Sequence, residues 1–404
     1  MAAIPRSGAR PPTPSRALAT LLAGLTLLTP VTIHLFFPVI PAVNAAFGLS
    51  EALGQLAFSI GVFALAVSTL VYGSLADRWG RRPVLLAGLA LFLAGCVIAA
   101  LGTSFTALLF GRLVQAAGAG CGITLARVIA RDVYGAAGLV KAIAYLSLAF
   151  ALGGLLAPGI GGVLVDHAGW RSIFVLAGAA GVAAILGSLA LIPRGAPAAV
   201  RGTPGTARGG SGLLELMRHP RFCALVIHTG ASTATFFTLA TASSVLMKET
   251  LHRPATEFGL YFAMVPIGFI AGTLTSSRLA GRVPLERMVL TGGTITLAAV
   301  AVQSALLLTG HLTPFVLFIP GTFTTFAQGL SLPFAQAGAM AVVPRLAATA
   351  AGAGVFMQNF MGAGAAQVWG LIADGTPVPL VETTTVMAVL GFAAALAATR
   401  APAT

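Results

Sequence analysis

An arginine in the interior of an apolar stretch is the first residue of this chain that could do chemistry. Arg112 follows Phe105 by seven residues, about 10 Å of helical rise, and Gln115 lies one turn further on. A guanidinium in apolar surroundings is costly and is a functional candidate by default. We therefore expect Arg112 and Gln115 to handle a polar or anionic part of a small molecule. The alternative is that Arg112 extends its head group to a nearby surface.

The composition shows which elements must position these side chains. The chain has 404 residues, of which 57% are hydrophobic and only 8% are charged, against about 25% charged residues in ordinary soluble domains. So few charges cannot cover a soluble fold, which excludes a soluble enzyme, a coiled coil and a disordered protein. A membrane-spanning helix needs about 20 apolar residues, so the length allows twelve. We predict an all-α membrane protein with 12 transmembrane helices.

Twelve apolar blocks of suitable length follow one another along the chain. Their approximate ranges are 17–41, 53–75, 83–102, 105–128, 140–165, 171–192, 222–246, 255–279, 287–309, 312–339, 347–371 and 379–399. An even number of spans places both termini on the same side of the membrane.

Lys and Arg are distributed very unevenly between the two sides of this topology. Nineteen lie on the side of the termini, and only three, Arg171, Lys248 and Arg253, lie on the other. Positive charge accumulates in cytoplasmic loops. We therefore expect a multi-pass protein of the bacterial inner (plasma) membrane with both termini in the cytoplasm.

A Gly-, Pro- and Arg-rich stretch interrupts the pattern between the sixth and seventh blocks. It predicts a cytoplasmic linker over 193–220, with a short surface helix at Leu213–Arg218. The expected domains are a cytoplasmic tail over 1–16, a six-helix bundle over 17–192, this linker, and a second six-helix bundle over 221–400.

An internal repeat supports the two halves. Leu75, Ala76 and Arg78 have counterparts at a constant offset of 204 residues, although Gly281 replaces Asp77. Repeated halves of six helices are typical of secondary transporters, whose substrate site lies near the midplane between the repeats.

The run from Gly73 to Arg82 carries the most specific motif, G-x-x-x-D-R-x-G-R-R. Gly73 would allow a close helix approach, Asp77 could face a helix N-terminus or pair with an arginine, and the arginines would lie at the anionic inner leaflet. Alternatively, the arginines only set the topology. The motif residues are Gly73, Asp77, Arg78, Gly80, Arg81 and Arg82.

On this motif the chain is identified as a member of the major facilitator superfamily. The resemblance implies two pseudo-symmetric six-helix bundles and a conformational latch on the cytoplasmic side. The fifth block resembles the antiporter motif G-x-x-x-G-P-x-x-G-G of this superfamily, with Ala157 in place of one glycine, and its matching residues are Gly153, Pro158, Gly161 and Gly162. This likeness implies a drug:proton antiporter; the alternative is ordinary packing of small residues.

Further segments resemble the bicyclomycin/chloramphenicol-resistance (Bcr/CflA) branch. They are Leu125–Tyr134, Gly169–Phe174 and Pro333–Ala339. In that branch, the arginine of span 4 and an acidic residue of span 1 handle substrate and protons.

This chain departs from the branch at the acidic position. His34 stands there, four residues before Pro38, and the span interiors of the N-terminal half contain no Asp or Glu. A histidine can gain and lose a proton near neutral pH, so His34 is a candidate proton carrier. The alternative is a neutral histidine that bonds locally or touches substrate. Proton antiport is thus implied by the resemblance alone.

The C-terminal half offers aromatic and amide side chains for an adaptable apolar site with a few polar anchors. The candidates are His228, Phe236, Phe237, Gln328 and Asn359. His228 is a second candidate proton carrier, although each residue could equally serve packing or face lipid.

These residues together predict a monomeric transporter, not an enzyme, that exports amphiphilic small molecules. The proton is the expected coupling ion, the substrate is neutral or anionic, and alternating access is the mechanism. The missing carboxylate favours the alternative of an uncoupled facilitator or a metabolite transporter. The sequence offers no nucleic-acid module, nucleotide-binding loop, cofactor site or metal-ligand spacing.

Overall fold

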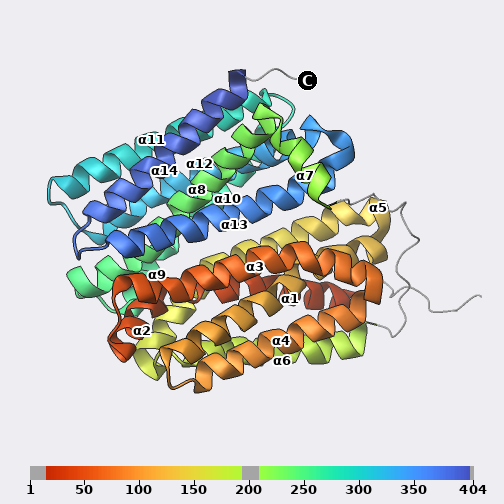
Figure 1. Ribbon diagram of the computed structural model, residues 1–404, viewed down its shortest axis with the longest axis horizontal. Coiled ribbons are helices and arrows are strands. Elements are labelled where there is room, and N and C mark those ends of the chain that lie inside the picture. Colours follow the sequence, from red (N-terminus) through yellow and green to blue (C-terminus); the bar gives the residue numbers. More distant parts are fainter. Residues whose placement is uncertain (1–14, 193–208, 401–404) are drawn as a thin grey trace, which may run out of the picture.

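The computed structural model describes residues 15–192 and 209–400 and shows two helical bundles side by side along their length (Figure 1). Within these ranges all regular elements are helices. The elements α1 to α6 form the first bundle, and α8 to α14 form the second.

The first bundle contains six spans. Its elements are α1 (Arg16–His34), η1 (Phe37–Val39), α2 (Ile40–Phe47), α3 (Glu51–Trp79), α4 (Arg81–Leu101), α5 (Phe105–Ala168) and α6 (Ser172–Leu191). The long helix α5 includes two spans, Phe105–Tyr134 and Tyr145–Ala168.

The second bundle repeats this plan. Its elements are α8 (Pro220–Val245), η2 (Leu246–Thr250), α9 (Ala255–Phe262), α10 (Met264–Leu279), α11 (Leu285–Leu308), α12 (Pro314–Val342), η3 (Pro344–Leu346), α13 (Ala347–Ile372) and α14 (Val378–Arg400). Here α9 and α10 together form one span.

The predicted number of spans is confirmed. Eleven helices in the described residues are long and apolar enough to cross a membrane, and α13 is the twelfth, less apolar because it contains Gln358, Asn359 and Gln367. The first span extends to Phe47 rather than ending near residue 41. Pro38 and Pro41 lie in the first turns of η1 and α2, where proline starts a helix rather than breaking it.

Local sequence explains where several helices begin. Ser15 and Ser104 accept hydrogen bonds from the backbone amides of Leu18 and Ala107 at 3.1 and 3.2 Å, and so cap α1 and α5. Such caps satisfy amides that have no partner within the helix.

The predicted linker coincides partly with a docked helix. Its residues 193–208 lie outside the described residues, but α7 (Gly209–Met217) packs on the second bundle. Leu216 is fully buried in this contact, and Glu215 forms an ion pair with Arg345.

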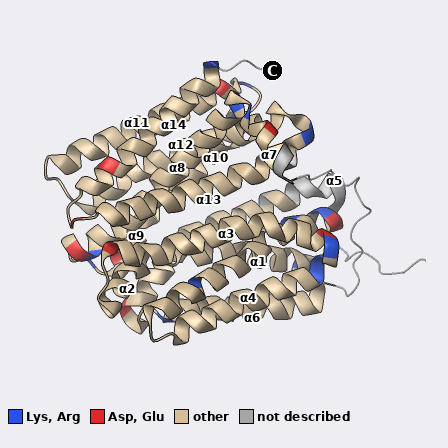
Figure 2. Cartoon of the chain, in the orientation of Figure 1, with Lys and Arg blue, Asp and Glu red and all other residues tan. Residues whose placement is uncertain are grey.

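The two ends of the bundles differ in charge. We call the end that carries Arg16 and Arg400 the termini end, and the opposite end, with α2 and α9, the far end. Figure 2 shows that Lys and Arg of the first bundle gather at the termini end, as the charge count predicted.

Candidate functional site

Arg112 is held inside the first bundle. Its Nε donates to the Ala57 carbonyl at 3.2 Å, and its Nη1 donates to the Thr32 carbonyl at 3.0 Å and to Oε1 of Gln115 at 2.9 Å. The guanidinium carbon also lies 4.1 Å from the ring centroid of Phe36. With 1% exposure, Arg112 does not reach the surface, so the predicted interior position is confirmed.

The positive charge of Arg112 has no acidic counter-charge nearby. Among the described residues, no carboxylate lies within ion-pair distance of it, and its Nη2 has no hydrogen-bond partner. A Cβ at Gly61 would lie 2.9 Å from Nη2, so this glycine provides the space for the head group. Two main-chain oxygens, the amide oxygen of Gln115 and a ring face thus balance the charge of Arg112 only in part, and its field favours negative or neutral groups.

His34 lies where three helices from both bundles meet. Its ring stacks on Phe37 at 5.4 Å between centroids, and meets Phe236 of α8 edge-on at 5.9 Å. A Cβ at Gly154 of α5 would lie 3.0 Å from its Nδ1. His34 therefore contacts both bundles, whereas Arg112 contacts only the first.

Aromatic rings from both bundles surround His34 and form what we call the seam cluster. Phe58 of α3 meets Phe237 of α8 at 5.5 Å, and Phe37 meets Phe262 of α9 at 5.4 Å. The cluster consists of His34, Phe37, Phe58, Phe236, Phe237 and Phe262. It offers apolar ring faces next to one ionisable side chain, which suits a molecule with apolar and polar parts.

His228 lies away from the seam, within the second bundle. Its Nδ1 lies 3.0 Å from the Gly391 carbonyl oxygen, and its Nε2 lies 3.1 Å from Oγ of Ser331. Both ring nitrogens therefore have partners on α14 and α12, and the side chain is 2% exposed. This arrangement is that of a satisfied interior histidine.

The two predicted amides of the second half also bond locally. Nε2 of Gln328 donates to Oγ1 of Thr233 at 3.0 Å, and Nδ2 of Asn359 donates to the Val355 carbonyl at 2.9 Å. The structure thus brings His34, Phe236 and Phe237 together, and separately pairs Arg112 with Gln115.

Glycines of the antiporter motif place α5 against two helices at backbone distance. Two of these glycines face the first span: a Cβ at Gly153 would lie 2.6 Å from the ring of Pro30, and a Cβ at Gly161 would lie 2.7 Å from the Leu35 carbonyl oxygen. A Cβ at Gly162 would lie 2.2 Å from the carbonyl oxygen of Ala255 in the second bundle. The predicted close packing is confirmed, and it closes the seam between the bundles at the far end.

Asp166, which the sequence analysis did not single out, adds a polar contact at the same place. Its Oδ2 accepts hydrogen bonds from the backbone amide and the hydroxyl of Thr256, both at 2.7 Å, and its Oδ1 accepts from the Ala255 amide at 3.2 Å. Asp166 of the first bundle thereby caps α9 of the second. The only sequence signal was a carboxylate in the last turn of a span.

Three further hydrogen bonds join the bundles in the far half of the molecule. They run from Ser59 to the Ala363 carbonyl (3.1 Å), from Gln367 to the Ala52 carbonyl (2.9 Å) and from Ser244 to the Phe37 carbonyl (2.7 Å). Within the described residues, all hydrogen bonds between the bundles lie in this half. The far end is therefore closed.

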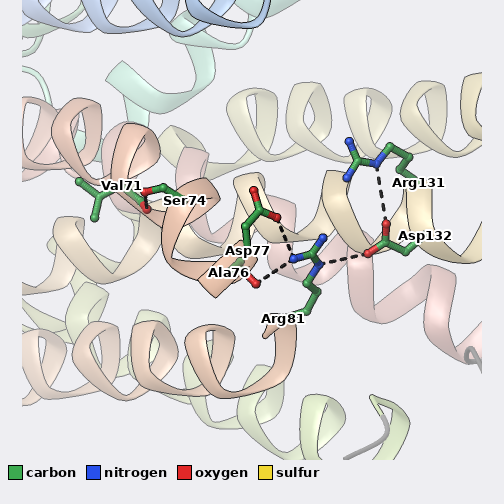
Figure 3. A network of polar contacts seen from close by, with 7 residues as sticks. All are labelled: Val71, Ser74, Ala76, Asp77, Arg81, Arg131 and Asp132. Carbon is green, nitrogen blue, oxygen red and sulfur yellow. Dashed lines mark hydrogen bonds and ion pairs between the residues drawn. The ribbon is translucent and has the colours of Figure 1, made fainter. Parts of the chain in front are cut away.

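Residues of the predicted latch motif take part in a polar network at the termini end (Figure 3). Nη1 of Arg81 donates to Oδ1 of Asp77 and to the Ala76 carbonyl, both at 2.8 Å, and its Nε donates to Oδ2 of Asp132 at 3.2 Å. Arg131 lies 3.7 Å from the other oxygen of Asp132. The network ties α3, α4 and α5 of one bundle together.

The remaining motif residues differ in what they contact. Gly80 has a φ of 90° and turns the chain from α3 into α4, a conformation that favours glycine. Arg82 donates to the Leu189 carbonyl of α6 at 3.0 Å, and Arg78 is exposed. A Cβ at Gly73 would meet no atom within 4 Å. The close approach expected at Gly73 is therefore wrong, because no neighbouring helix in the described part of the chain comes within contact distance of this position.

Two six-helix halves, closed at one end and joined by a largely aromatic seam, define a multi-pass membrane transporter. Residues 22–366 match the Major Facilitator Superfamily, and the chain belongs to this family, which is one of transporters and not of enzymes.

Known proteins agree with this assignment. The chain is 30% identical over 240 residues to the multidrug resistance protein MdtL of Shigella dysenteriae and to that of Escherichia coli K12. The match covers 59% of this chain and 60% of each relative.

Solved structures show the same fold. A bacterial homologue of the human lysosomal transporter Spinster, in an inward-facing and occupied conformation, superposes with a TM-score of 0.76 at 19% identity, over 98% of both chains. The xylose transporter XylE from E. coli superposes with a TM-score of 0.73 at 14% identity, over 94% of this chain and 96% of its own.

Proposed function

We propose that this protein exports amphiphilic small molecules by alternating access, in exchange for protons. The observation that carries the proposal is the seam cluster, in which the ionisable ring of His34 lies among aromatic rings from both bundles. A substrate at this seam would contact both moving bodies, which a carrier requires. The multidrug relatives support this substrate class.

The electrostatics of the first bundle favour neutral or anionic substrates. Arg112 is a permanent cation, and no described carboxylate balances it. Phe36 and the Thr32 carbonyl connect it to the same helical segment that carries His34. A dicationic drug would therefore be repelled at the seam, whereas a neutral or anionic amphiphile would not.

His34 is the proposed proton carrier. A proton on its ring adds a second positive charge to the first bundle, on the span whose Thr32 carbonyl accepts a hydrogen bond from Arg112, so proton binding and substrate binding would influence each other. The remaining candidates, Gln115, His228, Gln328 and Asn359, would act as supporting contacts once the seam opens.

The orientation completes the proposal. The termini end, which is rich in Lys and Arg, would face the cytoplasm of a bacterial cell, because loops rich in Lys and Arg stay on the cytoplasmic side of the membrane. The proposed domains are the tail 1–16, the bundles 17–192 and 221–400, and the linker 193–220. Each monomer would act as a complete carrier in the plasma membrane.

A susceptibility panel in an efflux-deficient host tests this function. We expect expression to raise resistance to neutral or anionic amphiphiles, and a proton uncoupler to remove that resistance. His34→Gln should abolish substrate-driven proton flux in proteoliposomes, whereas His311→Gln, an exposed loop histidine, should not. Resistance that persists with the uncoupler would rule out proton coupling.

The second candidate is an uncoupled facilitator or a metabolite transporter. It is favoured by the lack of Asp and Glu in the span interiors of the first bundle. Proteoliposomes with an imposed pH gradient separate the two functions, because only a coupled carrier accumulates substrate above its equilibrium concentration.

A further inference from the structure

A groove opens sideways where α3 of the first bundle meets α13 of the second. It is lined by side chains between Leu56 and Phe63 on α3 and between Phe360 and Gln367 on α13, and has a volume of about 280 Å³. Because both bundles line the groove, a molecule bound in it would contact α3 of the first bundle and α13 of the second at the same time.

The walls of the groove face the surrounding membrane. Phe63 and Phe360, whose rings lie 6.2 Å apart across the seam, are 42% and 48% exposed within apolar spans. In a bilayer, such surfaces meet acyl chains rather than water.

The groove has a polar end and an apolar end. Gln367 lies five residues before the end of α13 at Ile372, about 8 Å by helical rise, whereas Phe360 lies about 18 Å from that end. The groove thus runs from near the far surface toward the midplane. A phospholipid of the far-end leaflet has the same polarity along the same direction.

An amide side chain marks the polar end. Gln367 lines the groove and is only partly buried, and its Nε2 donates to the Ala52 carbonyl at 2.9 Å. The other lining side chains are mostly apolar. A polar head group therefore finds its match beside Gln367, and an acyl chain finds its match beside the apolar residues.

A glycine leaves the wall of the groove open. A Cβ at Gly364 would meet no atom within 4 Å, so a larger side chain there extends into the groove without displacing the helix. A substitution at Gly364 can therefore fill the groove without disturbing the packing of α13.

We propose that this groove binds one acyl chain of a phospholipid from the far-end leaflet, with the head group beside Gln367. The bound chain contacts both bundles and so stabilises the arrangement in which the far end is closed. This site is separate from the seam cluster and does not depend on the identity of the exported substrate.

Photo-crosslinking in nanodiscs tests the site. Phospholipid with a diazirine on its acyl chain should label wild-type peptides 56–63 and 360–367. Gly364→Phe should lose this labelling, and Gly364→Leu should reduce it. Val368→Phe, an exposed position on the same helix outside the groove, should keep it. Elution as a single species in size-exclusion chromatography verifies that each variant folds.

Two results would overturn the proposal. Equal labelling of wild type and both Gly364 variants would show that the groove holds no lipid. Labelling of these peptides by a diazirine derivative of an exported amphiphile, but not by the phospholipid, would assign the groove to substrate instead.

Discussion

The two ends of the molecule hold their helices together in different ways. At the far end, contacts cross from one bundle to the other: Gly162 lies against Ala255, and Asp166 caps α9. At the termini end, ion pairs remain within a half, as in the Arg81 network of the first bundle. The first kind of contact joins the two bodies, whereas the second makes each body rigid.

This difference indicates which end separates first. Among the described residues, the hydrogen bonds between the two bundles all lie in the far half. The bundles can therefore separate at the termini end without breaking a hydrogen bond between them. The structure is closed at the far end, and in the proposed alternating-access cycle the opening of this end would have to break the contacts of α5 with α9.

The largest effect should come from filling the closest contact between the bundles. Gly162→Leu places a side chain where the Ala255 carbonyl oxygen would lie 2.2 Å from Cβ, and overpacking costs about 1–3 kcal/mol. We expect far-end closure and transport to be lost, measured by spin-label distances across the far end and by uptake in proteoliposomes. Gly24→Leu, where a Cβ meets nothing within 4 Å, is the control. Unchanged distances in the Gly162 variant would contradict the assignment of this contact to closure.

Neutralising the brace at the termini end should have the next largest effect. Asp132→Asn removes the carboxylate that faces Arg81, which is only 4% exposed. Because a hydrogen bond to a charged group contributes about 1.5–3 kcal/mol, the thermal midpoint should fall while far-end distances stay unchanged. Asp77→Asn should lower the thermal midpoint by a smaller amount, because the Asp77 side chain is 69% exposed. A shift in far-end distances would show that this network controls the opposite end directly.

Removing the cap on α9 should have a smaller effect that is confined to closure. Asp166→Ala loses a helix cap, which is worth about 1 kcal/mol, so the far-end-open fraction should rise roughly fivefold. Spin-label distance distributions measure this fraction.

Asp374→Ala is the control for the cap. Asp374 lies in the loop before α14 and, among the described residues, hydrogen-bonds only to Thr376, whose hydrogen bonds keep the pKa of Asp374 below its usual value. Because this contact lies within one loop, the variant should leave closure unchanged. Equal opening in both variants would remove the special role of Asp166.

The smallest effect should come from the ion pair of Arg345 with Glu215. Both residues are exposed, with side-chain exposures of 69% and 36%, and such pairs contribute about 0–1 kcal/mol. Glu215→Gln should therefore leave transport and the thermal midpoint almost unchanged. A large loss of transport would mean that the docking of α7 regulates the second bundle.

The spans and part of the polar network around Arg81 could be predicted because their signals are local. Apolar block length predicted the twelve helices, and the motif predicted that Asp77 faces a helix N-terminus or pairs with an arginine; the structure shows that its partner is Arg81. The third partner, Asp132, lies 51 residues from Arg81, and no pattern along the chain connects them. Asp166 was missed for the same reason, since its partners lie 89 and 90 residues away.

The candidate site could be predicted only in part. Burial of Arg112 followed from its depth in an apolar block, but its carbonyl partners depend on how α1 and α3 pack. The sequence ranked His34 before His228 only through the resemblance, and did not show that the second bundle also contacts His34 whereas His228 has its partners within one bundle. That distinction arises from tertiary structure alone.

The manner in which Arg112 is held has an electrical consequence. A guanidinium stays protonated in proteins, and the hydrogen-bond partners of Arg112, the Ala57 and Thr32 carbonyls and Gln115, all belong to the first bundle, so its charge moves with that bundle. Moving one elementary charge across the full membrane potential is worth about 2.3 kcal/mol per 100 mV. The substrate-free protein should therefore respond to voltage in proportion to the share of the field that Arg112 crosses, and a proton on His34 would increase that response.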